Sequence, residues 1–538
     1  MVIVSCSIYD SVAKLWRGPA PEVPLHDPKC SVGCLLFNAL KLKPKAVALI
    51  SDSEQTSITY EELLSGSIRV AQQLQSLSLK QDDIVGIVSE QLLSTTYVLL
   101  ACWFNATPFH AINPTHEQAV LEHLFGITRP KLIFCEAKSY PKVSTACKRL
   151  QLNATIYVIS TPIEGVASLV DLMKPTSTED SYTPVDLLKD EAQTVSIINS
   201  SGTSGRPKAV CLSNNIMSFN VCEFEESDIT LTFSPLDWLT STIFTVATIF
   251  AGATRLITAT PYTPEYLVHL VTKYRITCMV LSPTDSARLL KLRGVEQIDF
   301  SSLRQVFTGG SAMPAVIYRN LRKLFKDETR QRIKNCYGST EFGGITSLNT
   351  NAGKPTAVGK LLPGCKMKIV DDAGESLGVG EVGEILKNSG KRWNGYYGNP
   401  EETSKMQDAD MWIHSGDLGY FDADGDLFIV DRKKDIMKYC NVQYSPQEIE
   451  DVIAELADVV EVCVFGHTNE TEGDRAAAAI VRRPEGELTE AQVVHHVAER
   501  FPVEWKRLHG GVFFLECLPK TGNGKVIRRD TKAMALRG

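Results

Sequence analysis

The stretch SSGTSGRPKAV, residues 200–210, lies between two short runs of β-forming residues. It places four hydroxyl residues, two glycines and Lys208 on one flexible connection. Backbone amides, hydroxyls and an ammonium group together bind phosphate, so the stretch predicts a phosphate-binding loop. It is not a Walker loop, because Pro207 precedes the lysine and Ala209 has no hydroxyl for a magnesium ion. Taken alone, the same composition also fits a solvated Gly/Ser linker.

Around this loop, helical patterns alternate with short β-rich runs from about residue 30 to residue 430. The helix expected over Thr59–Leu77 repeats its apolar residues every three to four positions, as a crossover helix on a sheet does. This alternation predicts the α/β class, with layered and largely parallel sheets. The clearest β-rich runs are Ala46–Ile50, Ile84–Val88, Leu132–Cys135, Ala154–Ile159 and Thr194–Ile198.

The pattern changes after Val430, where a charged DRKKD segment precedes one amphipathic helix and two strand-like runs. The remaining chain is long enough for a small α+β domain that hinges on the larger one. We therefore expect an N-terminal domain over residues 1–431 and a C-terminal lid domain over residues 432–538. The expected elements of the lid are a helix at Gln447–Leu456 and strands at Val459–Val464 and Ala476–Val481.

The 538 residues carry a formal net charge of −7 and no basic tail, which argues against nucleic acid as a partner. The 14 cysteines are scattered, and no signal-peptide pattern opens the chain, which favours a reduced protein in the cytoplasm. Tyr97–Phe109 and Thr242–Ala253 are the most apolar stretches. Both are shorter than the roughly 20 residues of a bilayer span, so we expect core helices and no transmembrane segment.

Four further motifs follow the loop in order along the chain. Together the five motifs resemble the signature of the adenylate-forming enzymes, which include acyl-CoA synthetases, peptide-synthetase adenylation domains and beetle luciferases. The resemblance extends over essentially the whole chain and points to the 4-coumarate:CoA ligase and luciferase-like branches. The four motifs are YGSTE at 337–341, HSGDLGYFDADGDLFIVDR at 414–432, KYCNVQYSPQEIE at 438–450 and PKTGNGK at 519–525.

This resemblance implies a reaction in two steps. A small carboxylic acid first joins the α-phosphate of ATP and releases pyrophosphate, and the acyl group then passes from AMP to the thiol of CoA. Charge neutralisation dominates the first step, because an anion must attack a polyanion. ATP, CoA and the acid are therefore the expected small-molecule partners, and Mg²⁺ is the expected metal.

The resemblance also implies a role for each motif residue. Lys525 becomes the catalytic lysine, and Glu341 offers the hard oxygen ligand that Mg²⁺ prefers. Tyr337 is expected to stack on adenine, and Asp417 to accept hydrogen bonds from the ribose hydroxyls. The implied catalytic residues are Lys525, Thr340, Glu341 and Lys208. The implied ATP-binding residues are Ser200, Ser201, Gly202, Thr203, Ser204, Gly205, Lys208, Gly310, Tyr337, Gly338, Asp417 and Arg432.

For the second step, family resemblance implies that the small domain rotates about Lys434 and presents another face, which carries Lys438, Asn441 and Gln443. Asn441 stands where relatives carry a glycine that lets pantetheine pass close to the backbone. Asn is the substitute that best tolerates positive φ, but its side chain is expected to crowd the channel. The sequence therefore supports adenylation more firmly than thioester formation.

The implied acyl pocket departs from the family pattern at Trp238, where ligase and luciferase relatives carry a histidine that gates the acyl tunnel. Neighbouring pocket positions are small or apolar, which favours a hydrophobic acid over a charged amino acid. The implied pocket residues are Trp238, Gly309, Gly343 and Gly344.

Three functions are compatible with these residues. The first is an ATP- and Mg²⁺-dependent acid:CoA ligase for a medium- or long-chain fatty acid or an aryl acid. The second is an adenylate-forming enzyme with a different second step, such as luciferase-like oxidation. The third is a weak paralogue kept for nucleotide or acyl binding, against which the retained Glu341 and Lys525 argue. The final residues, MALRG, do not resemble a Ser-Lys-Leu address, which favours the cytoplasm over the peroxisome.

Overall fold

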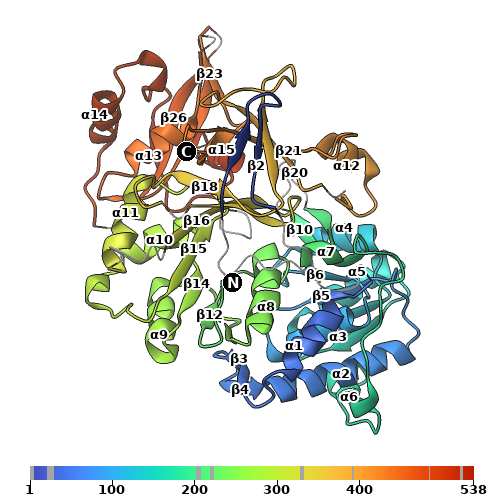
Figure 1. Ribbon diagram of the computed structural model, residues 1–538. Coiled ribbons are helices and arrows are strands. Elements are labelled where there is room, and N and C mark those ends of the chain that lie inside the picture. Colours follow the sequence, from blue (N-terminus) through green and yellow to red (C-terminus); the bar gives the residue numbers. More distant parts are fainter. Residues whose placement is uncertain are drawn as a thin grey trace.

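Three β-sheets with helices packed on them make up the protein (Figure 1). Two sheets belong to a large domain and the third to a small C-terminal domain, which confirms the predicted α/β class. The computed structural model describes residues 5–20, 29–200, 207–217, 223–326, 333–349, 351–390, 393–440, 442–469, 471–483, 485–520 and 525–537.

The seven-stranded sheet carries both ends of the phosphate-binding loop. Its strands pair in parallel, except that β10 and β11 pair antiparallel with Ser200 opposite Lys208. The central strands are buried on both faces, as parallel strands between two helical layers are. In spatial order the strands are β11 (Lys208–Ser213), β10 (Thr194–Ser200), β6 (Phe109–Ile112), β5 (Val85–Val88), β7 (Leu132–Cys135), β8 (Thr155–Val158) and β9 (Ala167–Ser168).

The fifteen-stranded sheet has a half that is parallel from β3 to β16, with β4 antiparallel at its edge, and an antiparallel half from β16 to β1. The prediction of largely parallel sheets therefore fails for the half from β16 to β1. Neighbouring strands there pair antiparallel, and some of them follow each other through short connections such as residues 340–343 and 422–426. In spatial order the strands are β1 (Ile8–Asp10), β2 (Leu15–Arg17), β19 (Lys366–Val370), β20 (Gly383–Asn388), β21 (Ile413–Phe421), β22 (Leu427–Arg432), β18 (Ala357–Leu361), β17 (Gly344–Asn349), β16 (Ile333–Ser339), β15 (Gln305–Gly309), β14 (Cys278–Val280), β12 (Ile229–Leu231), β13 (Thr254–Ile257), β3 (Val47–Ser51) and β4 (Thr56–Thr59).

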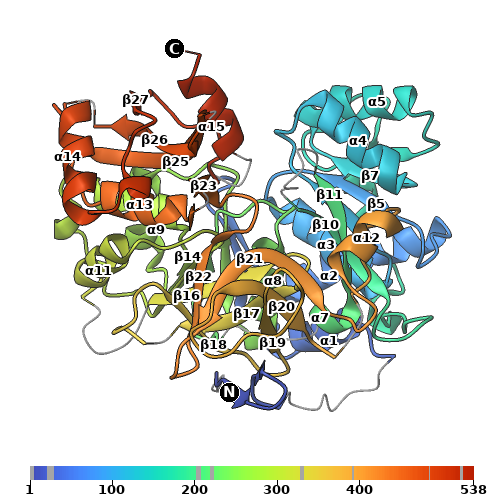
Figure 2. The ribbon, with the colours of Figure 1, turned by 90° about the horizontal axis from the view of Figure 1, so that it is seen from above.

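The small domain is built on the third sheet, which begins at Met437. The predicted boundary after residue 431 falls inside β22, whose last residue is Arg432. Figure 2 shows this domain, in orange and red, beside α11 (Ala315–Leu324) of the large domain, and Figure 1 shows it above the same helix. Its elements are β23 (Met437–Tyr439), β24 (Val442–Tyr444), α13 (Pro446–Ile453), β25 (Val459–Asn469), β26 (Gly473–Arg482), α14 (Glu490–Arg500), β27 (Val512–Phe514) and α15 (Arg528–Ala535).

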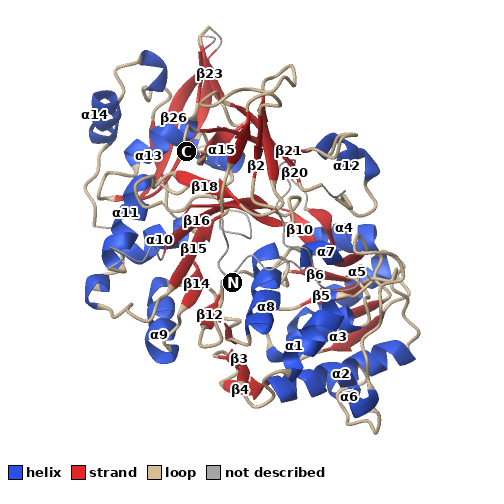
Figure 3. Cartoon of the chain, viewed as in Figure 1, coloured by secondary structure: helices blue, strands red, loops and turns tan. Residues whose placement is uncertain are grey.

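Four helices that lie close together in Figure 3 contribute many residues to the main hydrophobic core of the large domain: α1 (Val32–Lys41), α2 (Tyr60–Ser76), α3 (Leu93–Phe104) and α8 (Leu239–Ala251). The two apolar stretches fall on the buried helices α3 and α8, as predicted. The first stretch is helical only to Phe104, because Phe109 already belongs to β6. None of the helices in the described part of the chain is long and apolar enough to cross a membrane.

The packing of α1 on α3 gives a test of this core. A Cβ atom on Gly33 would lie 2.0 Å from the carbonyl oxygen of Trp103, a backbone atom that cannot move without shifting α3. We expect Gly33→Ala to lower the free energy of unfolding by about 3 kcal/mol through overpacking. Gly126→Ala in α4 (Gln118–Thr128) is the matched control, because its nearest neighbour is Leu150 Cδ2 at 3.7 Å.

The control should be neutral or stabilising by up to about 1 kcal/mol, since Ala is the better helix former. Thermal denaturation of both variants measures the difference. Equal melting temperatures for the two variants would show that α1 can move away from α3 without cost.

Candidate active site

A cavity of about 950 Å³ lies where the small domain faces the large domain. Its wall contains both basic and acidic side chains, and the basic ones suit a polyanionic ligand such as a nucleotide. The basic residues among the described part of this wall are Lys208, Lys405, Arg432, Lys433, Lys434 and Lys525. The structure thus brings the predicted residues Lys208, Thr340, Glu341, Asp417, Arg432 and Lys525, from four separate motifs, to one place.

Asp417 is a buried acid at the cavity wall with two side-chain partners. It pairs across β21 and β22 with Arg432, whose Nε lies 2.7 Å from Oδ1. The Tyr337 hydroxyl on β16 donates to Oδ2 at 2.7 Å. Burial raises the pKa of Asp417, while Arg432 and Tyr337 oppose this change. Tyr337 is itself buried and does not line the cavity, so its described contact is with the carboxylate.

Lys525 reaches the cavity from the small domain. Its Cε lies 3.9 Å from the position that a Cβ on Gly310 would occupy, and Gly310 has a φ of +84°. Burial and the nearby Arg432 lower the pKa of Lys525 to about 8, although Asp417 and Glu341 act in the opposite direction. The pKa of the Lys525 side chain therefore depends on the charged groups around it in the cavity.

The chain after Lys525 is anchored by a buried ion pair. Arg528, the first residue of α15, donates from Nη2 to Glu450 Oε1 at 2.7 Å and from Nε to the Val464 carbonyl at 2.7 Å. The Glu450 carboxylate also accepts the Val464 amide at 2.8 Å. These contacts tie the start of α15 to α13 and β25, which keeps Lys525 in a defined place relative to the small sheet.

The structure describes the two ends of the predicted phosphate-binding loop, Ser200 and residues 207–210. Ser200 and Lys208 both line the cavity. The Lys208 ammonium lies 2.6 Å from Glu402 Oε2 and 4.7 Å from the centroid of the Tyr396 ring. Five predicted loop residues lie outside the described part of the chain, namely Ser201, Gly202, Thr203, Ser204 and Gly205.

Glu341 and Thr340 line the cavity in the turn after β16. The Tyr396 hydroxyl donates to Glu341 Oε1 at 2.9 Å, which orients the carboxylate. A carboxylate and a hydroxyl at the cavity wall are oxygen donors of the kind that a hard cation requires, so the residues present fit Mg²⁺.

Glycines keep the backbone close-packed at the cavity wall. A Cβ on Gly338 would lie 2.0 Å from the Gly344 carbonyl oxygen, and one on Gly309 would lie 2.5 Å from the Cys336 carbonyl oxygen. Gly309 and Gly344 line the cavity beside Trp238, whereas Gly343 does not. The apolar side chains Leu239, Ile243, Phe244, Val280, Phe307 and Ile345 complete this wall.

The residues predicted for the second step lie elsewhere. Lys438 and Gln443 are opposite each other on the β23–β24 hairpin, are exposed, and do not line the cavity. Asn441 lies outside the described residues. Lys434, the predicted hinge, does line the cavity, and burial lowers the pKa of its side chain.

Two parts of the site were not predicted. Tyr396 lies in GYYGNPEET, residues 395–403, whose turn residues were visible but whose contact with Glu341 was not. Glu384 lies 3.7 Å from His414 Nδ1 and 3.2 Å from Lys433 Nζ, and these two neighbours lower its pKa to about 2. His414 belongs to a recognised motif, but its partner comes from the pairing of β20 with β21, which no local pattern shows.

Sequence and structure comparisons identify the family of this chain. A sequence model described as "AMP-binding enzyme" matches residues 36–397, and one described as "AMP-binding enzyme C-terminal domain" matches residues 448–525. The first match extends over more than half of the chain, so the protein belongs to the AMP-binding, adenylate-forming enzyme family.

Its curated relatives are luciferases and 4-coumarate–CoA ligases. Luciferin 4-monooxygenase of Photinus pyralis is 27% identical over 97% of both chains. 4-Coumarate–CoA ligase 1 of Arabidopsis thaliana is 28% identical over 97% of this chain and 96% of that chain. The crystal structure of the anthranilate CoA ligase AuaEII in complex with anthranoyl-AMP has the same fold, with a TM-score of 0.85, 23% identity and coverage of 96% of this chain and 98% of that chain. ATP-bound MatB from Rhodopseudomonas palustris also has it, at a TM-score of 0.83, with 24% identity and coverage of 94% and 99%.

The contact between Tyr337 and Asp417 gives a prediction for nucleotide binding. Tyr337→Phe removes a 2.7 Å hydrogen bond to a buried carboxylate, and we expect the Kd for ATP to rise about tenfold. Calorimetric titration with ATP measures the change. Tyr420→Phe is the matched control. Tyr420 lies on β21, the strand that carries Asp417, but its ring stacks on Phe428 and it does not line the cavity. An equal effect of both variants would mean that Asp417 does not need the Tyr337 hydroxyl.

Proposed function

We propose that the protein is an ATP-dependent acid:CoA ligase that forms an acyl-adenylate and then an acyl-CoA thioester. The observation that carries this proposal is the meeting of Lys525 from the small domain with Glu341 and Asp417 from the large domain around one cavity. The cavity continues from these charges into an apolar wall, so a single pocket offers places for a nucleotide and for a hydrophobic acid.

In the proposed first step, a carboxylate oxygen of the acid attacks the α-phosphorus of ATP. The new bond joins carboxylate to phosphate, and the bond to pyrophosphate breaks. Lys525 would donate to the negative charge that develops between the two anions, and Lys208 would bind the phosphates from the other side. Mg²⁺ held by Glu341 would supply further neutralisation of phosphate charge.

In the proposed second step, the sulfur of CoA attacks the acyl carbonyl and AMP leaves. The relatives named 4-coumarate–CoA ligase support CoA as the acceptor. Lys438 and Gln443 lie outside the cavity in the present arrangement, so this step would require the small domain to turn its β23–β24 hairpin inward.

A second candidate function is adenylation followed by a reaction without CoA. The similarity to luciferin 4-monooxygenases supports it. A paralogue that only binds nucleotide is the weakest candidate, because Lys525, Asp417 and Arg432 are not only retained but also assembled.

One experiment separates these candidates. The chain is incubated with ATP, Mg²⁺ and a panel of aryl and aliphatic acids, with and without CoA, and AMP release, thioester formation, oxygen consumption, pyrophosphate exchange and ATP binding are measured. A ligase should release AMP together with an equal amount of thioester only when CoA is present. Release of AMP with oxygen uptake and without thioester would assign the second function. A chain that binds ATP but catalyses no pyrophosphate exchange would be the paralogue.

Lys525 gives the sharpest test of the first step. Lys525→Ala should slow adenylation about 100-fold or more, because a charge-stabilising donor at the reacting phosphate is lost. In the wild-type enzyme, the ammonium is the charged form below a pKa of about 8, so kcat/KM for adenylation should fall as the pH rises through 8. Lys525→Arg should remove this decline, since a guanidinium stays protonated.

The control for this prediction is the other half-reaction of the same variant. Conversion of a supplied acyl-adenylate to thioester should remain near the wild-type rate in Lys525→Ala, because the second step would use the other face of the small domain. Equal loss in both half-reactions would show that Lys525 serves the fold of the small domain rather than adenylation.

A further inference from the structure

Three phenylalanine rings stand at the apolar end of the cavity. Phe244 of α8 and Phe307 of β15 line it, with ring centroids 6.1 Å apart. Phe224 does not line the cavity, but its ring packs edge-on against both, at 5.1 Å from Phe244 and 6.3 Å from Phe307. Phe224 therefore lies behind the two lining rings and supports them.

Charged groups lie next to this aromatic wall, on the side away from the cavity. The Lys334 ammonium is 5.6 Å from the centroid of the Phe307 ring and 3.0 Å from Glu223 Oε2. Lys334 is only 8% exposed and does not line the cavity. An alkyl chain that passed the Phe307 ring would have to separate this pair, and a buried charge without its partner is strongly unfavourable.

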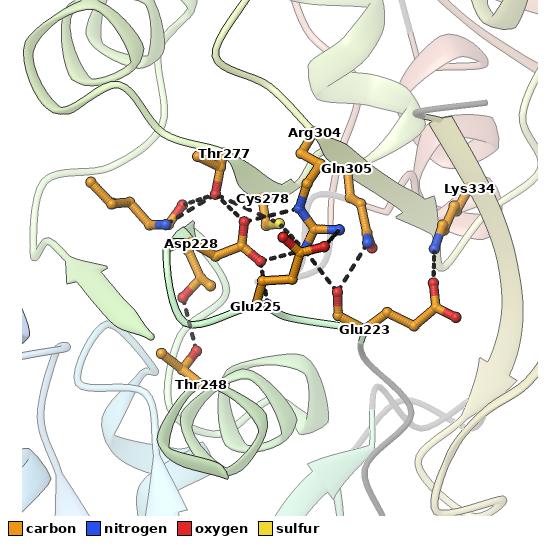
Figure 4. A network of polar contacts seen from close by, with 11 residues as sticks. Glu223, Glu225, Asp228, Thr248, Thr277, Cys278, Arg304, Gln305 and Lys334 are labelled. Atoms are coloured by element: carbon orange, nitrogen blue, oxygen red, sulfur yellow. Dashed lines mark hydrogen bonds and ion pairs between the residues drawn. The ribbon is translucent and has the colours of Figure 1, made fainter. Parts of the chain in front are cut away.

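The backbone beside Phe224 is clamped to the sheet, as Figure 4 shows for its polar neighbours. Arg304 donates from Nη2 to the Glu223 carbonyl at 2.8 Å, and Gln305 donates to the same carbonyl at 3.0 Å. Arg304 Nε also donates to the buried Asp228 carboxylate at 3.0 Å. These bonds hold the backbone on both sides of Phe224 against the sheet, and the contacts of the Phe224 ring with Phe244 and Phe307 keep the ring in its place.

We propose that Phe224 and the charged network around it form the closed end of the acyl pocket and restrict this enzyme to compact carboxylic acids, such as a one-ring aryl acid or a short branched acid. This inference rests on the proposed adenylation activity and narrows its substrate class.

The test compares acids of increasing length. Pyrophosphate release is measured for benzoic acid, 4-coumaric acid and straight-chain acids from butanoic to hexadecanoic acid. For the wild type, we expect kcat/KM to fall about tenfold or more between octanoic and dodecanoic acid. Phe224→Ala should raise kcat/KM for dodecanoic acid about tenfold, with Phe224→Leu intermediate. The leucine variant keeps most of the packing and so preserves the test if the alanine variant does not fold.

Phe300→Ala is the matched control, because the Phe300 ring packs edge-on against Phe325 at 5.2 Å and neither residue lines the cavity. It should leave the length profile unchanged. Two results would overturn the proposal that Phe224 closes the acyl pocket. One is a wild-type enzyme that uses hexadecanoic acid as well as benzoic acid, and the other is a Phe224→Leu variant with an unchanged length limit.

Failure of the proposed function has a different signature, namely no pyrophosphate release from any acid. The length limit is then measured by calorimetric binding of acyl-sulfamoyl adenosines with the same series of acyl chains. Selective binding of the short analogues by the wild type, relaxed in the Phe224 variants, supports the wall independently of turnover. Equal binding of all lengths by the wild type contradicts it.

Discussion

The site depends on one buried carboxylate, that of Asp417, which is only 7% exposed. A carboxylate in such a place needs partners, because an unpaired charge away from water is strongly unfavourable. Tyr337 and Arg432 supply them from two other strands of the fifteen-stranded sheet. The pairing of β21 with β22 and the course of β16 are therefore constrained by the same interaction, and the charged floor of the cavity is fixed before any ligand enters.

The same constraint joins the two domains. Arg432 binds Asp417 as the last residue of β22, and its charge also helps to lower the pKa of Lys525 across the cavity. The Arg528–Glu450 pair holds the chain after Lys525 against the small sheet. A movement of the small domain would remove Lys525 from the cavity while leaving Asp417 and Arg432 paired. The Asp417–Arg432 pair thus lies within the fifteen-stranded sheet, whereas Lys525 comes to the cavity from the small domain.

On the apolar side of the cavity, side-chain packing rather than charge pairing determines the shape. Phe244 and Phe307 belong to a small aromatic cluster that is separate from the main core, and Phe224 completes that cluster. Arg304, Asp228 and the pair of Lys334 with Glu223 hold it in place. Polar contacts that do not touch the cavity therefore decide the shape of its apolar end.

Much of this protein was already determined by local sequence. The α/β class, the strand Leu132–Cys135, the first part of β25 at Val459–Val464, and the buried helices α3 and α8 follow from hydrophobic patterns, because such patterns depend only on neighbouring residues. The motifs also identified Lys208, Glu341, Asp417, Arg432 and Lys525, which the fold brings to one cavity. What only the tertiary structure decided is the set of partners: Tyr396 for Glu341, Glu384 for His414, and Phe224 behind Phe307. Each of these contacts joins residues that are far apart in the chain, and their distance is set by strand order, which no local pattern contains.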